Sequence, residues 1–262
     1  MSQHHDQHES ALVIVPTYNE RENLRIVIDD IHRNVPWADI LVVDDGSPDG
    51  TGELAEEIHA NDSRINVLHR SGKLGLGSAY IMGFQWGLAR DYQLLIEMDA
   101  DGSHPAVELP AMLRISEQAA ARPDLVIGSR WTPGGSVVDW PRHRELLSRG
   151  GNTYANMMLG LKVHDATAGY RVYRASTLSD LELEGVDSRG YCFQVDMTLR
   201  VLDQGGTIIE HPIEFRDRVR GTSKMSQAIV LEAMSKVTLW GVQRRWRRLT
   251  RRSSRSPRQQ QP

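Results

Sequence analysis

Short apolar segments alternating with helix-forming segments are the feature that most constrains how this chain can fold. Residues 11–15 and 39–43 are short, largely apolar runs, which are typical of parallel strands buried on both faces. Between them, residues 20–34 carry leucine, valine and isoleucine at helical spacing. The start of the chain is therefore predicted to form a strand, a helix and a second strand.

The same alternation continues beyond this unit. Strands are predicted at residues 65–68, 93–98 and 125–127, and helices at residues 50–60, 75–89, 145–161 and 192–204. Alternation of this kind predicts an α/β fold with a mostly parallel central sheet flanked by helices, whose ligand crevice lies at the carboxyl ends of the strands. Residues 131–143 are rich in glycine and proline and open a less regular half, which we expect to face the substrate.

Composition excludes several classes of protein. With 262 residues, 40% of them hydrophobic and 25% charged, the chain is neither disordered nor fibrous. Cys192 is its only cysteine, so no intrachain disulfide can form, and a reducing compartment is indicated. No window approaches the roughly 18 to 20 apolar residues of a membrane span, and the first residues lack the apolar stretch of a signal peptide. We therefore expect a cytoplasmic protein.

Charge is distributed unevenly. The net charge is −3, yet eight arginines fall in the last nineteen residues, and without them the remaining chain has 23 basic against 34 acidic residues, a net charge of −11. Residues 225–249 carry a helical apolar pattern that runs into this arginine-rich end. An amphipathic basic helix of this kind favours an anionic membrane surface. A nucleic-acid-binding protein is the alternative, but the acidic remainder offers no second basic stripe.

Acidic and polar residues follow three of the predicted strands, at residues 16–20, 44–47 and 99–101. A pair such as Asp99 and Asp101 is a weak signal alone, because turns and helix caps also use aspartate. Its position directly after an apolar strand favours a different role. Two such carboxylates can hold a hard divalent cation that also bridges a substrate diphosphate.

Two phosphate-binding motifs are excluded. The triplet Gly75-Leu76-Gly77 suggests a dinucleotide fingerprint, but the third glycine position is occupied by Tyr80. Lys73 lacks the upstream glycine of a P-loop. An NAD-dependent oxidoreductase, which the α/β pattern alone would allow, is therefore disfavoured.

Six motifs occur in order at residues 15–20, 43–50, 73–77, 98–101, 128–130 and 221–224. As a set they resemble the polyprenol (dolichol) phosphate mannosyltransferases of glycosyltransferase family 2. The resemblance implies a GT-A fold, GDP-mannose as donor, Mg²⁺ or Mn²⁺ as cofactor, a polyprenyl phosphate acceptor, and inversion at the anomeric carbon to give polyprenyl phosphate mannose. A UDP-glucose-dependent polyprenyl phosphate glucosyltransferase is the alternative.

The resemblance also assigns roles to individual residues. Donor contacts are implied for Pro16, Tyr18, Glu20, Val43, Asp45, Lys73, Asp99, Ala100, Asp101, Arg218, Arg220 and Lys224. Asp99 and Asp101 would bind the metal. Relatives often supply a glutamine as a further ligand, whereas this chain has Gly102-Ser103-His104, so Ser103 or a water would complete the site.

The catalytic residues implied are Asp101, on the leaving-group side, and Arg130, Arg144 and Ser148, which would position the acceptor phosphate. Surface salt bridging is the usual role of an arginine. In an acidic body, however, arginines that flank a diphosphate site are better explained as phosphate ligands, since guanidinium binds phosphate oxygens bidentately. A lipid monophosphate is already largely dianionic at pH 7, so we expect no general base.

These expectations divide the chain into a disordered N-terminus (residues 1–9), a GT-A catalytic domain (10–230) and a basic amphipathic helix with a tail (231–262). Some relatives carry transmembrane helices that this chain lacks. We therefore expect a peripheral enzyme on the cytoplasmic face of the membrane, recruited by the basic tail and by an integral membrane partner.

Overall fold

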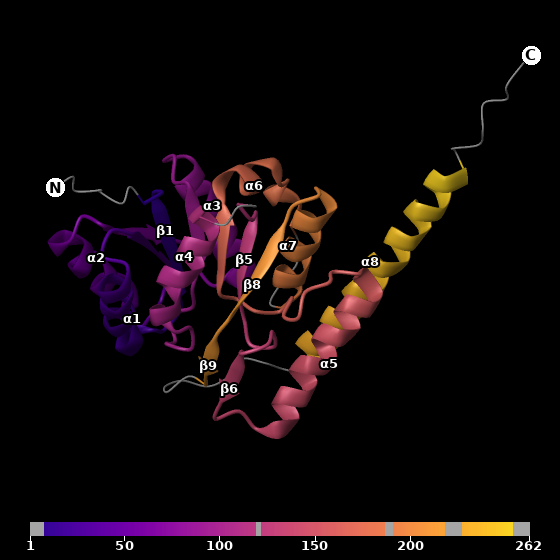
Figure 1. Cartoon of the computed structure of the whole chain (residues 1–262). Helices are drawn as coiled ribbons and strands as arrows, with labels where there is room; N and C mark the ends of the chain where they lie inside the picture. The colour runs from indigo at the N-terminus through magenta and orange to yellow at the C-terminus, as the bar shows by residue number, and fades with distance from the viewer. Residues whose placement is uncertain (1–7, 119–121, 187–190, 218–226, 254–262) are drawn as a thin grey trace, which may run out of the picture.

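The computed structural model describes residues 8–118, 122–186, 191–217 and 227–253, with only the backbone described at 191, 227–232 and 247–253. Within these ranges seven strands form one central sheet, with helices on both faces (Figure 1). The strands are β1 (Ala11–Thr17), β2 (Asp39–Asp44), β3 (Ile65–His69), β4 (Leu94–Glu97), β5 (Leu125–Ser129), β7 (Arg171–Arg174) and β8 (Ile208–Pro212).

Their order in the sheet is β3-β2-β1-β4-β7-β5-β8. All neighbours are parallel except β7, which runs antiparallel between β4 and β5. A second sheet of two short strands pairs β6 (Ser136–Val138) with β9 (Glu214–Arg216). The predicted mostly parallel sheet is confirmed, and the antiparallel β7, the parallel edge strand β8 and the small second sheet are additions to it.

Helices cover both faces of the sheet because its strands are apolar on both sides. They are α1 (Arg21–Asn34), α2 (Thr51–Asn61), α3 (Leu76–Leu88), α4 (Leu109–Gln118), α5 (Arg142–Leu159), α6 (Ala175–Asp180), α7 (Tyr191–Asp203) and α8 (Gln227–Ser253), with 3₁₀ turns at Ala106–Glu108 and Leu183–Gly185. On β1, Val13 packs in a core cluster with α1, α2 and α4. Its neighbour Leu12 packs in a second cluster with α3, α6 and α7.

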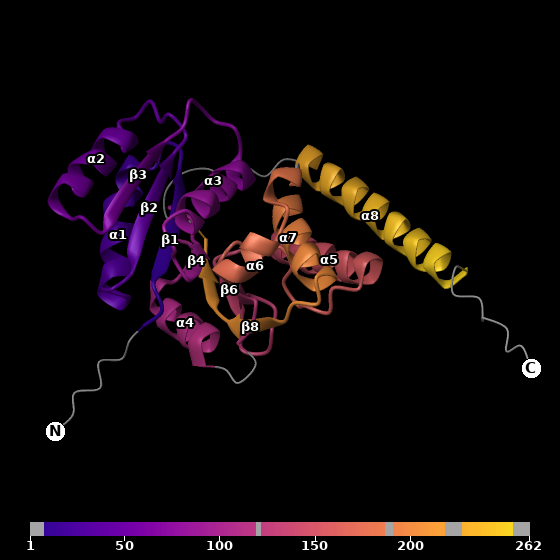
Figure 2. The ribbon, with the colours of Figure 1, turned by 90° about the horizontal axis from the view of Figure 1, so that it is seen from above.

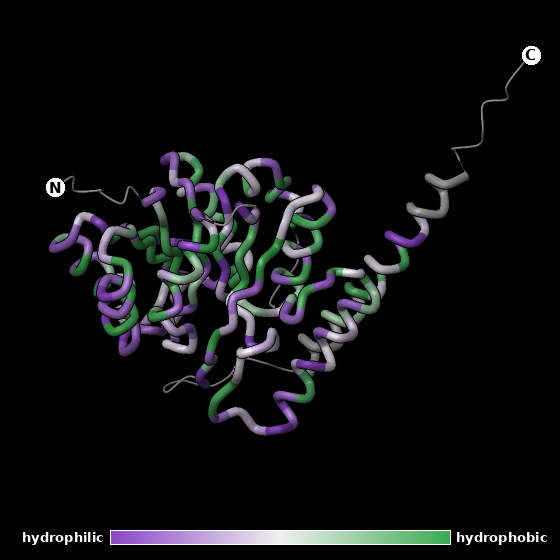
Figure 3. The backbone as a smooth tube through the Cα atoms, in the orientation of Figure 1, coloured by the Kyte–Doolittle hydropathy of each residue, from purple (hydrophilic) through white to green (hydrophobic). Residues whose placement is uncertain are grey.

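The pair α5 and α8 lies beside the sheet, as two roughly perpendicular views show (Figures 1 and 2). Val237 of α8 packs in a third apolar cluster with Ala155 and Leu159 of α5. Figure 3 shows that hydrophobic residues are concentrated in the central strands, whereas polar and apolar residues alternate along α5 and the described part of α8. None of the described helices is both long and apolar enough to span a bilayer.

Candidate active site

The carboxyl ends of β2, β1 and β4 meet at one edge because these strands are parallel neighbours. Thr17 pairs with Asp44 in the β1–β2 register, and the Thr17 hydroxyl donates to the Asp44 carboxylate at 2.9 Å. The backbone N–H of Ser47 donates to the same carboxylate at 3.0 Å. Asp44 therefore holds the two strand ends together, and its neighbour Asp45 follows directly after the carboxyl end of β2.

Asp45 forms a buried ion pair with Arg70, whose guanidinium also donates to the Ser78 hydroxyl at 2.6 Å. Burial raises the pKa of Asp45 above its usual value, against the opposing effect of the Arg70 guanidinium. A nucleotide at this edge would meet a carboxylate whose orientation is fixed by Arg70. Arg70 has no recognisable motif of its own in the sequence, because its pairing with Asp45 depends on a contact 25 residues away in the chain.

Two predicted donor residues meet beside this pair. The ammonium group of Lys73 lies 4.4 Å from the centre of the Tyr18 ring, a cation–π contact. Glu20 precedes α1, and its carboxylate accepts from Asn23 at 2.8 Å. Pro16 lies half-buried at the end of β1. The segments at residues 16–20 and 73–77 therefore come together through the contact between Lys73 and Tyr18.

Two other predicted donor residues belong to the core. Val43 is fully buried under α3, and Ala100 is buried among the residues packed against α1 and α4. Their side chains support the neighbouring aspartates rather than line an open crevice. Arg218, Arg220 and Lys224 lie outside the described residues.

Asp99 is held from two sides. The Tyr80 hydroxyl donates to Asp99 Oδ1 at 2.9 Å, and the Asp99 backbone N–H donates to His104 Nδ1 at 3.0 Å. This contact makes Nδ1 an acceptor, so the proton of neutral His104 resides on Nε2, which lies 4.0 Å from Asp99 Oδ2. Burial lowers the pKa of His104, which favours this neutral form.

Asp101 follows two residues later, and its Oδ1 accepts from the Ser103 backbone N–H at 3.0 Å. Among the described residues there is no cluster of three or more His, Cys, Asp or Glu side chains that could hold a metal. The protein thus offers two carboxylates, which are oxygen ligands suited to Mg²⁺ or Mn²⁺, and Ser103 is buried beside them. Burial raises the pKa of nearby Glu97 to about 8, which favours the protonated form of this third acid.

Arg130 lies at the end of β5 and pairs with the buried carboxylate of Asp165. Its Nε and Nη2 lie 2.7 Å from Asp165 Oδ2 and Oδ1 respectively, and Nη2 also donates to the Thr167 hydroxyl at 2.9 Å. Burial alone would raise the pKa of Asp165, but the charge of Arg130 together with hydrogen bonds from Arg130 and Thr167 holds that pKa below its usual value. The pair is therefore ionised.

Arg144 and Ser148 lie on α5 near Arg130. The Arg144 guanidinium stacks on the Trp140 ring at 4.0 Å and donates to Asp217 at 2.8 Å. The Ser148 hydroxyl accepts from Trp131 Nε1 at 3.2 Å. The three residues predicted to position an acceptor phosphate thus line one pocket.

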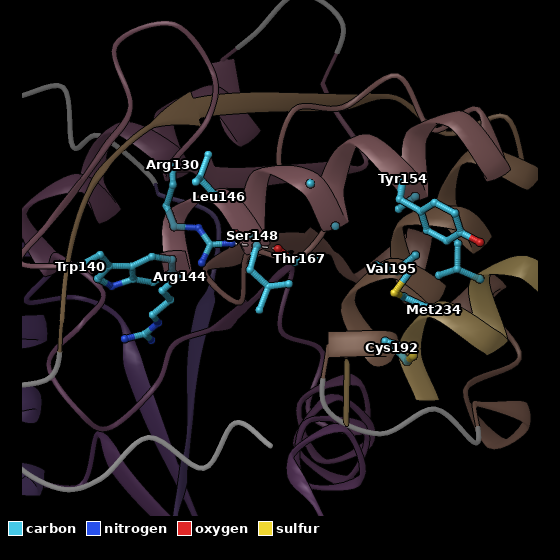
Figure 4. A pocket seen from close by; sticks show the side chains of 16 residues that line it. Arg130, Trp140, Arg144, Leu146, Ser148, Tyr154, Thr167, Cys192, Val195 and Met234 are labelled. Carbon is cyan, nitrogen blue, oxygen red and sulfur yellow. Dashed lines mark hydrogen bonds between the residues drawn. The ribbon is translucent and has the colours of Figure 1, made fainter. Parts of the chain in front are cut away.

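This pocket has a volume of about 290 Å³ and lies between α5, α7 and α8. Figure 4 shows Arg130, Arg144 and Ser148 gathered at one end and Val195 and Met234 at the other. The complete lining is Arg130, Trp140, Arg144, Leu146, Leu147, Ser148, Gly150, Gly151, Tyr154, Ala155, Thr167, Cys192, Val195, Ala233, Met234 and Val237. A cationic end and an apolar end suit a molecule that is a phosphate at one end and a hydrocarbon at the other.

Ring contacts connect this pocket to the aspartates. His104 lies against Phe215 at 5.8 Å between ring centroids, and Phe215 lies against Trp140 at 5.5 Å. Because Trp140 also stacks with Arg144, a chain of ring contacts links the cationic end of the pocket to the loop that carries Asp99.

Comparison with known proteins gives the family. Residues 12–181 match the sequence model described as glycosyl transferase family 2. The chain is 51% identical to a polyprenol monophosphomannose synthase of Mycolicibacterium smegmatis, over 90% of this chain and 89% of that protein. It is 52% identical to an undecaprenyl-phosphate mannosyltransferase of Micrococcus luteus, over 92% of this chain and 98% of that protein.

Among solved structures, the fold is similar to that of glucosyl-3-phosphoglycerate synthase of Mycobacterium tuberculosis in complex with Mn²⁺, UDP and glucosyl-3-phosphoglycerate. The TM-score is 0.61 at 21% identity, with 89% of this chain and 78% of that chain covered. The predicted GT-A architecture is confirmed by this likeness and by the family match. The chain belongs to glycosyl transferase family 2.

Proposed function

We propose that this protein transfers mannose from GDP-mannose to a polyprenyl monophosphate, with inversion, to give polyprenyl phosphate mannose. Two relatives of about half identical sequence are named for synthesis or transfer of this kind. The observation that carries the proposal is the pocket that joins Arg130, Arg144 and Ser148 to an apolar end. A sugar or protein acceptor would not need such an apolar extension.

The acceptor phosphate is its own nucleophile. Its second pKa is near 6, so it is largely dianionic at pH 7 and needs no protein base. One of its oxygens forms a bond to the anomeric carbon while the bond from that carbon to the GDP oxygen breaks, and GDP leaves with the electron pair. The protein contributes orientation, since Arg144 and Ser148 line the wall of the phosphate end and Arg130 is fixed there by Asp165.

On the leaving-group side, Asp99 and Asp101 would hold the divalent cation. When bound, it would neutralise charge that develops on the departing diphosphate. Lys73 and Tyr18, which contact each other, together with Asp45 and Glu20, would contact the nucleoside part. Arg218, Arg220 and Lys224 are retained as diphosphate ligands in this proposal.

The UDP-glucose alternative is less well supported, because the two compared relatives with about 51% and 52% identity carry mannosyl names. The neighbour with UDP bound shares only 21% identity and informs the fold alone.

Access to a lipid acceptor is part of the same proposal. On α8, Leu239, Val242 and Trp246 are exposed, and the sequence continues into the arginine-rich end. This arrangement supports peripheral attachment to an anionic cytoplasmic membrane face, with an integral membrane partner as a second means of recruitment.

A donor panel tests the reaction. Purified protein with a short-chain polyprenyl phosphate and Mn²⁺ or Mg²⁺ is given GDP-mannose, UDP-glucose or UDP-N-acetylglucosamine, and products are identified by mass and by NMR of the anomeric linkage. We expect GDP-mannose alone to give a β-linked mannosyl phosphate. Efficient use of UDP-glucose would replace the donor assignment, and retention of configuration would contradict direct attack by the phosphate.

A further inference from the structure

Tyr80 is a fully buried tyrosine that faces the metal-binding loop. It lies in the second turn of α3, and its hydroxyl donates to Asp99 Oδ1 at 2.9 Å. The Asp99 side chain itself is about one-third exposed, at 33%. A buried phenol thus holds one oxygen of a carboxylate that is partly exposed to solvent.

The tyrosine ring is fixed by its packing. It stacks on Phe193 of α7 at 6.3 Å between centroids and on Phe84 at 6.4 Å. A Cβ atom at Gly77, one turn earlier in α3, would lie only 2.7 Å from the Phe193 ring. The close contact between α3 and α7 therefore requires glycine there, and it leaves the phenol little freedom to turn away from Asp99.

The Tyr80 hydroxyl holds the Asp99 carboxylate through one oxygen, Oδ1. A carboxylate that accepts a fixed hydrogen bond on one oxygen loses rotational freedom, and hydrogen-bond partners of this kind orient metal ligands in many proteins.

We propose that Tyr80 is a positioning residue that orients the Asp99 carboxylate for the divalent cation. The inference rests on the proposed function, because it assumes that Asp99 binds that cation. α3 begins directly after the segment that carries Lys73. Tyr80 therefore also ties the orientation of the metal ligand to the helix next to the proposed nucleotide contact.

Direct binding of Mn²⁺ tests this role without substrate turnover. The free Mn²⁺ signal in electron paramagnetic resonance is titrated with wild-type protein and with Tyr80→Phe, which keeps the ring and removes the hydroxyl. We expect Mn²⁺ to bind about tenfold more weakly to the variant, the lower end of the loss found when a partner of a metal ligand is removed. Activity should recover substantially at saturating Mn²⁺.

Tyr92→Phe is the matched control. Tyr92 also donates its hydroxyl to an aspartate, Asp39, but at the start of β2, the opposite end of the strand from Asp44. We expect its Mn²⁺ affinity to equal that of the wild type. Thermal unfolding without metal shows whether each variant is folded.

A double substitution shows whether Tyr80 acts through Asp99. With Asp99→Asn as background, adding Tyr80→Phe should change Mn²⁺ affinity less than twofold. Phe193→Leu keeps the Tyr80 hydroxyl but loosens the packing of its ring, so we expect a smaller loss of Mn²⁺ affinity. This variant replaces Tyr80→Phe in the test if Tyr80→Phe fails to fold. Equal Mn²⁺ affinity of wild type and a folded Tyr80→Phe overturns the positioning role. Absence of Mn²⁺ binding by the wild type overturns the metal assignment as well, so the two failures are distinguishable.

Discussion

Arg130 and Asp165 form a buried ion pair in which two guanidinium nitrogens each lie 2.7 Å from a different carboxylate oxygen. The Arg130 backbone N–H donates to the same carboxylate at 3.1 Å, and the amide of Asn152 on α5 donates to it at 3.2 Å. Asp165 thereby connects the end of β5 to α5. The orientation of Arg130 in the pocket is set by this pair rather than by a ligand.

Removing the carboxylate should cost stability. Asp165→Asn leaves the Arg130 charge buried and without its counter-ion. We therefore expect the free energy of unfolding, measured with urea, to fall by about 3 kcal/mol. Asp203→Asn, which removes the surface partner of Arg244, is the control and should cost less than about 1 kcal/mol. Equal losses of stability in the two variants would show that the buried Arg130–Asp165 pair contributes no more to stability than the surface pair.

The contribution of Asp165 should also depend on pH. Because its pKa is lower in the folded protein than its usual value, the unfolded chain binds the proton more tightly. The stabilisation is therefore complete above the unfolded pKa of about 3.9 and is lost as pH falls through the folded value. Urea unfolding should show the same difference between wild type and Asp165→Asn at pH 6 and pH 4.5, and a smaller difference at pH 3.5.

Sequence patterns predicted the first half of the fold well, because strands buried on both faces are continuous apolar runs and amphipathic helices have a clear period. They missed β7, which has only four residues and arginine at each end. The side chain of Arg171 is fully buried and donates to the carbonyls of Ala166 and Ala168. A buried arginine satisfied by backbone groups has no distinct pattern in the sequence.

A candidate site could be proposed from the sequence where its residues lie in one short motif, as at Asp99 and Asp101. The residues that orient it were not. Tyr80 precedes its partner Asp99 by 19 residues, and Asp165 follows Arg130 by 35. In the sequence, Tyr80 and Asp165 have no feature that marks them as functional. Only the folded chain brings each of them into contact with its partner.

If Asp99 and Asp101 bind a divalent cation, removing the charge of one of these carboxylates should strongly reduce turnover. Asp101→Asn should lower turnover by at least about a hundredfold, because a group that stabilises leaving-group charge in the transition state acts mainly on the reaction rate. Unchanged thermal unfolding would establish that the fold is intact. EDTA should abolish wild-type activity and added Mn²⁺ should restore it. Full activity after chelation would contradict a role of Asp99 and Asp101 in metal binding.

Two arginines of α5 offer a matched test of the acceptor site. Arg144 lines the pocket, whereas Arg149 is exposed and pairs with Glu145. Arg144→Gln should raise the KM for polyprenyl phosphate about tenfold or more, since a charge-assisted contact contributes roughly 1.5–3 kcal/mol. The KM for GDP-mannose should change little, and Arg149→Gln should leave both constants near wild type. A larger increase in the KM for GDP-mannose than in the KM for polyprenyl phosphate would instead assign Arg144 to the donor site.

The last prediction concerns α8 and the membrane. Arg244 pairs with Asp203 at 2.6 Å, so a chain that ends after Arg244 keeps this contact and loses the seven later arginines together with Trp246, which is 70% exposed. Each basic residue near an anionic leaflet contributes about 1 kcal/mol.

The shortened chain should therefore bind vesicles containing phosphatidylglycerol much more weakly than the full chain in a sedimentation assay. The difference should be greatest at low salt, because added salt screens the attraction. Vesicles of phosphatidylcholine alone are the control, and activity on a water-soluble short-chain acceptor should stay within about twofold, since the pocket lining ends at Val237. Equal binding of both chains to anionic vesicles would remove the arginine-rich end from membrane attachment and leave recruitment to a membrane partner.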